Sequence, residues 1–78
     1  MVQLAAMTTE AGAKDEWQRL TKKYADLFEG RMLIVSKTER DGHSFWRVRT
    51  GGFADVTQAR AFCDRMRAKN AGCSIVEF

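Results

Sequence analysis

The fold of this chain is decided by one stretch, Phe45-Trp46-Arg47-Val48-Arg49-Thr50-Gly51-Gly52-Phe53. Successive side chains of a β-strand point to opposite faces, so Phe45, Arg47 and Arg49 share one face of it. Trp46, Val48 and Thr50 share the other face. Because an unpaired buried charge is costly, we expect the arginine face to be open and the tryptophan face to point into the core. A strand that displays Phe45 beside two guanidinium groups is typical of the centre of a binding surface.

The composition is that of a small globular domain. Of the 78 residues, 45% are hydrophobic and 29% are charged, so we expect one domain, 1–78, with one small core. We expect neither a transmembrane helix nor a signal peptide, because the chain has no long apolar run and begins with a patterned strand at Val2. The net charge of +3 suits an anionic partner without requiring nucleic acid, but a solvated surface with a slight excess of charge is the more common explanation.

The residues before the central stretch alternate first with the period of a strand and then with that of a helix. Residues 2–7 predict a strand with Gln3 on its outer face, and strict alternation turns Ala6 inward. Apolar residues then recur at steps of four and three, which predicts an amphipathic helix over 9–28, ended by Gly30.

A second strand and a second helix flank the central stretch. Residues 31–40 predict a strand, and Asp41-Gly42 predicts a type I′ hairpin turn into the central strand. Asp55 predicts the cap of a helix that Gly72 ends, and residues 73–78 predict a last strand.

The order β-α-β-β-α-β predicts an α+β fold, the ferredoxin-like or split βαβ arrangement, with a four-stranded antiparallel sheet and both helices on one face. The first and third strands then lie side by side, and Gln3 lies next to the row of Phe45, Arg47 and Arg49. The other sheet face has no helix to cover it, so we expect function there.

These motifs together resemble the SPOR (sporulation-related repeat) domain family over essentially all 78 positions. The resemblance rests on the following segments: Val2 to Ala6, the helix with Ala13, Trp17 and Leu20, Phe45 to Phe53, Ala59 to Cys63, and Gly72-Cys73. Family members more often carry glycine at position 5, an aromatic residue at position 7 and proline at position 52. Ala5, Met7 and Gly52 depart from that pattern.

The resemblance implies a non-catalytic, periplasmic cell-envelope module, excised from a longer protein. Such a module binds peptidoglycan glycan strands denuded of stem peptides and targets its parent protein to the division septum. It implies a monomer without cofactor, membrane contact or nucleic acid. The family's groove corresponds to Gln3, Ala6, Phe45, Arg47 and Ser74. Ala6 can line that groove only if the first strand ends or bulges there.

The chemistry of a denuded strand suits these residues. Removal of the stem peptide leaves a free lactyl carboxylate, which a guanidinium binds bidentately. We expect Arg47, together with Arg49, to bind that carboxylate and Phe45 to stack on a sugar face. The alternative is a solvated sheet face on which the arginines form ion pairs with Glu39 or Glu77.

Cys63 and Cys73 lie on either side of a chain reversal, so their side chains can meet. In an oxidising periplasm a disulfide between them contributes about 2–3 kcal/mol, and the alternative is two buried free thiols. We expect no metal site, because His43 is the only histidine and no Cys-x-x-Cys spacing occurs. No nucleophile–base pair is visible, so we expect no enzymatic activity.

Two other functions use the same topology. An RNA-recognition motif stacks bases on sheet aromatics, but its third-strand signature is missing from residues 45–49. A ferredoxin-like protein-interaction module is the other alternative, because the fold alone does not define function.

Overall fold

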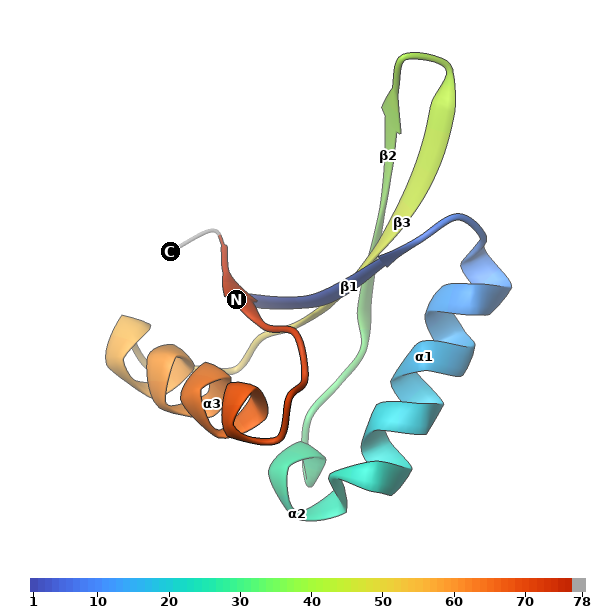
Figure 1. Cartoon of the computed structure of the whole chain (residues 1–78). Helices are drawn as coiled ribbons and strands as arrows, with labels where there is room; N and C mark the ends of the chain where they lie inside the picture. The colour runs from blue at the N-terminus through green and yellow to red at the C-terminus, as the bar shows by residue number, and fades with distance from the viewer. Residues whose placement is uncertain (77–78) are drawn as a thin grey trace.

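The computed structural model describes residues 1–76, which form four strands and three helices (Figure 1). In chain order these are β1 (Val2–Met7), α1 (Glu10–Lys23), α2 (Ala25–Phe28), β2 (Ile34–Arg40), β3 (His43–Thr50), α3 (Val56–Ala68) and β4 (Ser74–Ile75). The predicted order of strands and helices is confirmed, with the short α2 added after α1. Of the strand predicted over 73–78, the last two residues lie outside the described part of the chain.

The strands form one antiparallel sheet in the order β2-β3-β1-β4. The helices lie together on one side of this sheet, and the β2–β3 hairpin projects away from them (Figure 1). The predicted ferredoxin-like arrangement is therefore confirmed. No helix within residues 1–76 is long and apolar enough to cross a membrane.

A β-bulge in β1 changes which of its side chains face the helices. Gln3 pairs with Arg49 and Ala5 pairs with Val48, so Leu4 is an extra residue between two consecutive positions of β3. A bulge shifts the alternation of every residue that follows it. Leu4 is buried, whereas Ala6 is exposed and lies opposite Arg47. Strict alternation, which turns Ala6 inward, is wrong after Leu4.

Aromatic rings from all three helices meet beneath the sheet. The ring of Phe28 in α2 lies 5.2 Å from that of Trp17 in α1 and 5.5 Å from that of Phe62 in α3, both edge to face. The Phe53 ring lies 5.4 Å from the Phe62 ring, so the residues after β3 fold back over α3. These ring pairs add to the burial energy and join the three helices into one core.

A disulfide joins Cys63 in α3 to Cys73 before β4, with their Cα atoms 5.2 Å apart. Both residues are buried. The bond anchors the short strand β4 to the helix layer and closes a loop of few residues.

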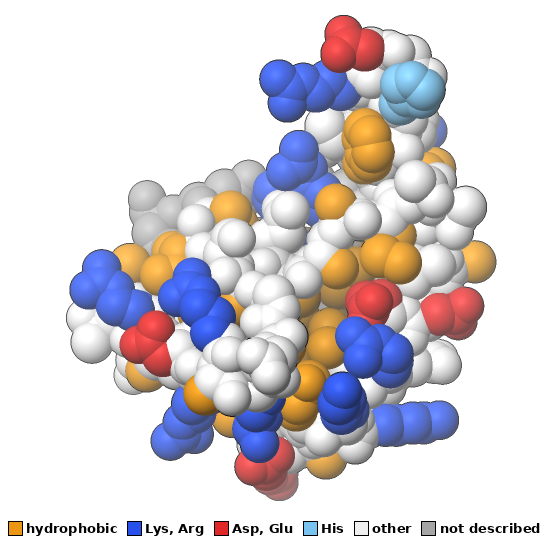
Figure 2. All heavy atoms as spheres, viewed as in Figure 1, with side chains coloured by type: hydrophobic (Ala, Val, Ile, Leu, Met, Phe, Trp, Pro, Cys, Tyr) orange, Lys and Arg blue, Asp and Glu red, His pale blue; other side chains and the backbone are white. Residues whose placement is uncertain are grey.

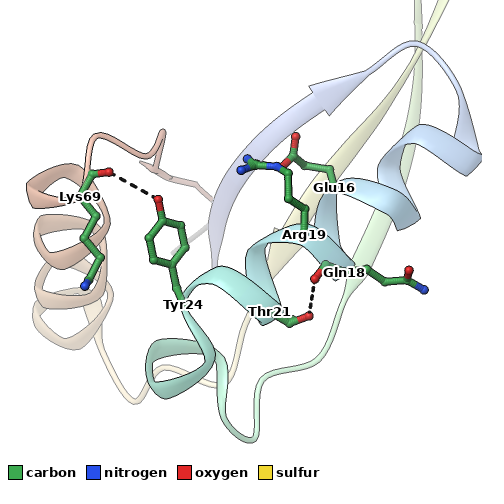
Figure 3. A network of polar contacts seen from close by, with 6 residues as sticks. All are labelled: Glu16, Gln18, Arg19, Thr21, Tyr24 and Lys69. Atoms are coloured by element: carbon green, nitrogen blue, oxygen red, sulfur yellow. Dashed lines mark hydrogen bonds and ion pairs between the residues drawn. The ribbon is translucent and has the colours of Figure 1, made fainter.

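The first helix is interrupted at Tyr24, where the prediction had one helix over 9–28. Tyr24 adopts φ −124° and ψ 48°, and its hydroxyl donates to the carbonyl oxygen of Lys69 at 3.4 Å (Figure 3). The buried tyrosine thus bonds a carbonyl at the end of α3, and the break turns α2 so that Phe28 reaches Phe62. Tertiary packing overrides the helical periodicity at this position.

The end of α3 also differs from prediction, because Asn70 and not Gly72 takes the left-handed conformation. Asn70 has a φ of 60° and follows the C-cap Lys69. The amides of Asn70 and Ala71 donate to the carbonyls of Arg67 and Met66, both at 2.9 Å, which is a Schellman motif. Asparagine tolerates this conformation better than other residues with a Cβ.

The second strand begins at Ile34 and not at Arg31 as predicted. Side-chain hydrogen bonds replace the strand ladder in the residues before it: Arg31 donates to the carbonyl oxygen of Gly51 at 3.2 Å, and Thr50 Oγ1 donates to that of Met32 at 2.8 Å. The Arg31 guanidinium also lies over the Phe53 ring, 4.1 Å from its centroid. The predicted hairpin turn is confirmed, with φ 53° at Asp41 and 78° at Gly42.

Candidate binding face of the sheet

One face of the sheet is left without a helix, and we call it the bare face. Directly opposed residues of antiparallel strands project to the same side, so the strand register defines its members. These are Gln3 and Ala6 of β1, Ile34, Ser36, Thr38 and Arg40 of β2, His43, Phe45, Arg47 and Arg49 of β3, and Ser74 of β4. All six residues predicted for the groove therefore lie on one side of the sheet.

Gln3 joins the two arginines at the centre of the bare face. Its Oε1 atom accepts from Arg49 Nε at 3.1 Å and from Arg47 Nη1 at 3.4 Å. A single amide oxygen therefore holds two guanidinium groups side by side and offsets part of their mutual repulsion. An arginine presents five N–H donors, so Arg47 keeps donors beyond this contact for a ligand.

Ala6 and Ser74 lie on either side of this centre. The bulge at Leu4 brings Ala6 opposite Arg47, where its small side chain leaves the guanidinium open. Ser74 pairs with Gln3 across β4 and is exposed. No local sequence signal predicts the bulge; only the family resemblance included Ala6.

Phe45 lies further along β3, outside the part of the strand that β1 covers. The pairing of β1 with β3 ends at Met7 opposite Trp46, so Phe45 pairs with Thr38 of β2 alone. It is half-buried and two residues from Arg47, about 7 Å along the strand. A ligand lying along β3 therefore meets a cation and then a flat apolar ring.

The opposite side of β3 belongs mainly to the core. Val48 is completely buried, which confirms the prediction. Trp46 is only half-buried, so the prediction that it is buried is wrong. Trp46 lies where β1 ends, and Lys37 Nζ covers its ring at 5.5 Å from the centroid. The same Lys37 pairs with Glu39 at 3.4 Å.

The sequence leaves open that Arg47 and Arg49 form ion pairs with Glu39. Within residues 1–76 the structure contains no such ion pair. Glu39 pairs with Ser44 across the hairpin and faces the side of Lys37, away from Arg47. Glu77, the other partner considered, lies outside the described residues.

Two recesses of the surface lie away from the centre of the bare face. One of about 350 Å³ lies between α1 and the loop after α3, lined by residues that include Arg19, Tyr24 and Lys69 (Figure 3). Another of about 310 Å³ is lined by residues 30–34 with Gly51 and Gly52. The arginine row is an open surface, which suits a polymer lying along the sheet better than a small enclosed ligand.

The fold and this face define a class of protein: a small α+β binding module that presents one side of an antiparallel sheet. Comparison with known proteins identifies the family. The family model of the SPOR domain matches residues 1–77. The chain belongs to the SPOR domain family.

Two curated relatives match most of the chain. The chain is 27% identical over 74 residues to the cell division protein FtsN of Caulobacter vibrioides, covering 95% of this chain and 28% of that protein. It is 26% identical over 73 residues to an uncharacterized protein of Rickettsia prowazekii, covering 92% and 33%. The chain thus spans about a third or less of the curated relatives it matches.

A solved structure has the same fold. The SPOR domain of RlpA from Pseudomonas aeruginosa superimposes with a TM-score of 0.70 at 19% identity, covering 99% of this chain and 96% of that one. SPOR domains bind peptidoglycan, and the chain belongs to that family.

Proposed function

We propose that this domain binds peptidoglycan glycan strands that have lost their stem peptides and directs its parent protein to the division septum. It acts as a non-catalytic, monomeric module in the periplasm, through Gln3, Ala6, Phe45, Arg47, Arg49 and Ser74. The observation that carries the proposal is the pair of guanidinium groups held by the Gln3 oxygen on the bare face.

The chemistry of this pair matches what stem-peptide removal exposes. An intact strand carries an amide at each lactyl group, whereas a denuded strand carries a free carboxylate. A charge-assisted hydrogen bond to a guanidinium is roughly twice as strong as a neutral one, so Arg47 favours the denuded form. Phe45 supplies a ring for the apolar face of a neighbouring sugar, and the exposed Ser74 hydroxyl and the Gln3 amide supply neutral donors.

The same face offers less to RNA. An RNA-recognition motif stacks two or three bases on sheet aromatics. Phe45 is the only phenylalanine, tyrosine or tryptophan on the bare face among residues 1–76. A glycan with carboxylates therefore fits the face better than a row of stacked bases.

The test compares Arg47→Ala with a matched variant that removes the same charge elsewhere. Arg60 is exposed on α3 in the helix layer, so Arg60→Ala serves as the control. We expect Arg47→Ala to reduce binding to amidase-treated sacculi at least tenfold, because a hydrogen bond to a charged group contributes about 1.5–3 kcal/mol. Arg60→Ala should bind like the parent.

Stability is measured alongside binding. The free energy of unfolding of both variants should lie within about 0.5 kcal/mol of that of the parent, since surface substitutions rarely cost more. Untreated sacculi and an RNA pool at matched salt complete the comparison. Equal binding of the parent and Arg47→Ala to denuded sacculi would show that Arg47 does not bind the carboxylate, and preferential capture of RNA would overturn the glycan proposal.

A further inference from the structure

The β2–β3 hairpin extends the bare face beyond the groove that the resemblance implies. The register of β1 with β3 ends at Trp46, whereas β2 and β3 stay paired as far as Arg40 and His43. Figure 1 shows this hairpin projecting past β1 and away from the helices. Its tight Asp41-Gly42 turn holds the two strands in register to the tip.

Two basic side chains lie on the bare face at this tip. Arg40 and His43 are register partners and project to the same side as Phe45 and Arg47. Both are exposed, and within residues 1–76 no ion pair engages either of them. Figure 2 shows basic, acidic and histidine side chains gathered at the projecting end of the molecule.

The other side of the hairpin differs from this one. There Lys37 is neutralised by Glu39 at 3.4 Å and lies over the Trp46 ring. One side of the hairpin therefore carries two unpaired basic groups, and the other carries an ion pair. Only the unpaired side is continuous with the arginines of the groove.

We propose that Arg40 and His43 form a second carboxylate subsite for the same glycan strand. This inference rests on the proposed function. His43 lies four residues from Arg47 along β3, about 13 Å, with Phe45 between them. In a denuded strand a lactyl carboxylate recurs at every second sugar. A strand that places one carboxylate at Arg47 and a sugar face on Phe45 therefore carries its next carboxylate toward Arg40 and His43.

The imidazole of His43 adds a hydrogen-bond donor to the outer subsite. The charged groups near it are Arg40, its register partner, and Asp41 in the turn; β1 and the helices end before this point. An N–H of this ring can donate to the same carboxylate that the Arg40 guanidinium binds.

The test uses this 78-residue chain and two denuded glycans, one with a single disaccharide repeat and one with three, in a fluorescence-anisotropy titration. The parent should bind the longer glycan more tightly. Arg40→Gln should weaken binding of the longer glycan about threefold to fivefold, as expected for an exposed ion pair, and leave the shorter one unchanged. Lys37→Gln is the matched control, since it removes one charge from the other side of the same hairpin.

The shorter glycan separates this inference from the function on which it rests. Arg47→Ala should weaken both glycans, whereas Arg40→Gln should weaken only the longer one. Equal weakening of both glycans by Arg40→Gln, or no weakening of either, would overturn the outer subsite while the groove stands. If the parent binds neither glycan, the proposed function and the subsite both fail.

A second variant gives an independent readout. His43→Ala removes the imidazole donor and should weaken binding of the longer glycan while leaving the shorter one unchanged. Equal binding of the longer glycan by the parent and by His43→Ala would remove His43 from the subsite. Thermal unfolding of each variant checks that the fold is retained.

Discussion

The two sides of β3 are one residue apart in the sequence and differ in almost every physical property. Val48 and Thr50 are completely shielded from solvent, and the Thr50 hydroxyl bonds to the Met32 carbonyl. Arg47 and Arg49, between and beside them, remain half-exposed and converge on one oxygen of Gln3. The packed side determines whether the domain folds, and the bare side determines what it can bind. Substitutions on the two sides should therefore change different measurements.

Phe62→Ala should have the largest effect on stability. Phe62 is 5% exposed and packs against Phe28 and Phe53, so its removal leaves a cavity at the centre of the helix layer. We expect a loss of about 3–5 kcal/mol in the free energy of unfolding, measured by urea denaturation. Phe45→Ala, which removes the same ring from the bare face, is the control. Comparable losses for the two variants would contradict the division between the faces.

Reduction of the Cys63–Cys73 disulfide should have the next largest effect. Closing a loop between residues ten apart contributes about 2–3 kcal/mol in the chain-entropy model. For a domain of this size, at about 4–8 °C per kcal/mol, we expect the melting temperature to fall by about 8–24 °C in reductant. A Cys63→Ala/Cys73→Ala variant should show no further fall when reductant is added. A further fall in that variant would show that the reductant destabilises the domain by a route other than the disulfide.

Phe45→Ala and Trp46→Ala compare neighbouring aromatic residues that project to opposite sides. Trp46→Ala should cost about 1–3 kcal/mol of stability, less than a full core truncation, because Trp46 is only half-buried. Its binding to denuded glycan should persist wherever it is folded.

Phe45→Ala should behave in the opposite way. We expect nearly unchanged unfolding and about a tenfold loss of glycan affinity, equivalent to roughly 1.4 kcal/mol, as is usual for an aromatic contact residue. Calorimetric titration of both variants measures the difference. If Trp46→Ala loses as much glycan affinity as Phe45→Ala, the two sides of β3 do not have separate roles in binding and stability.

Asp55→Ala should have the smallest effect and only on stability. The Asp55 carboxylate caps α3 by accepting from the Gln58 amide at 3.0 Å, and the Gln58 side chain accepts from the Ala54 amide at 3.1 Å. Loss of such a cap costs about 1 kcal/mol. Glycan affinity should not change, because α3 lies in the helix layer. Thr57→Ala, at an exposed position of the same turn, serves as the control.

Several parts of the fold could be predicted because short-range rules govern them. The alternation of Arg47 and Val48 about β3 follows from strand geometry and the cost of burying charge. The Asp41-Gly42 turn follows from its need for two positive φ angles, both of which are present. The cap at Asp55 follows from a side-chain oxygen that accepts from the backbone amide three residues later.

Other parts depend on contacts between distant segments and escaped prediction. Tyr24 interrupts the first helix because its hydroxyl reaches Lys69, 45 residues later. Residues 31–33 leave the predicted strand because Arg31 and Thr50 replace its ladder with side-chain bonds. Asn70 ends α3 two residues before Gly72, since the Schellman bonds form there.

By itself the sequence determined the topology, the two sides of β3 and the membership of Gln3, Phe45 and Arg47 in one row. These follow from alternation, turn chemistry and burial of apolar side chains, which act within a few residues. The tertiary structure alone decided that Leu4 bulges, that Ala6 consequently lies opposite Arg47, and that the hairpin extends past the end of β1. The register between two strands is set by how their side chains pack against the helices, and that packing energy belongs to the assembled fold and to no single segment.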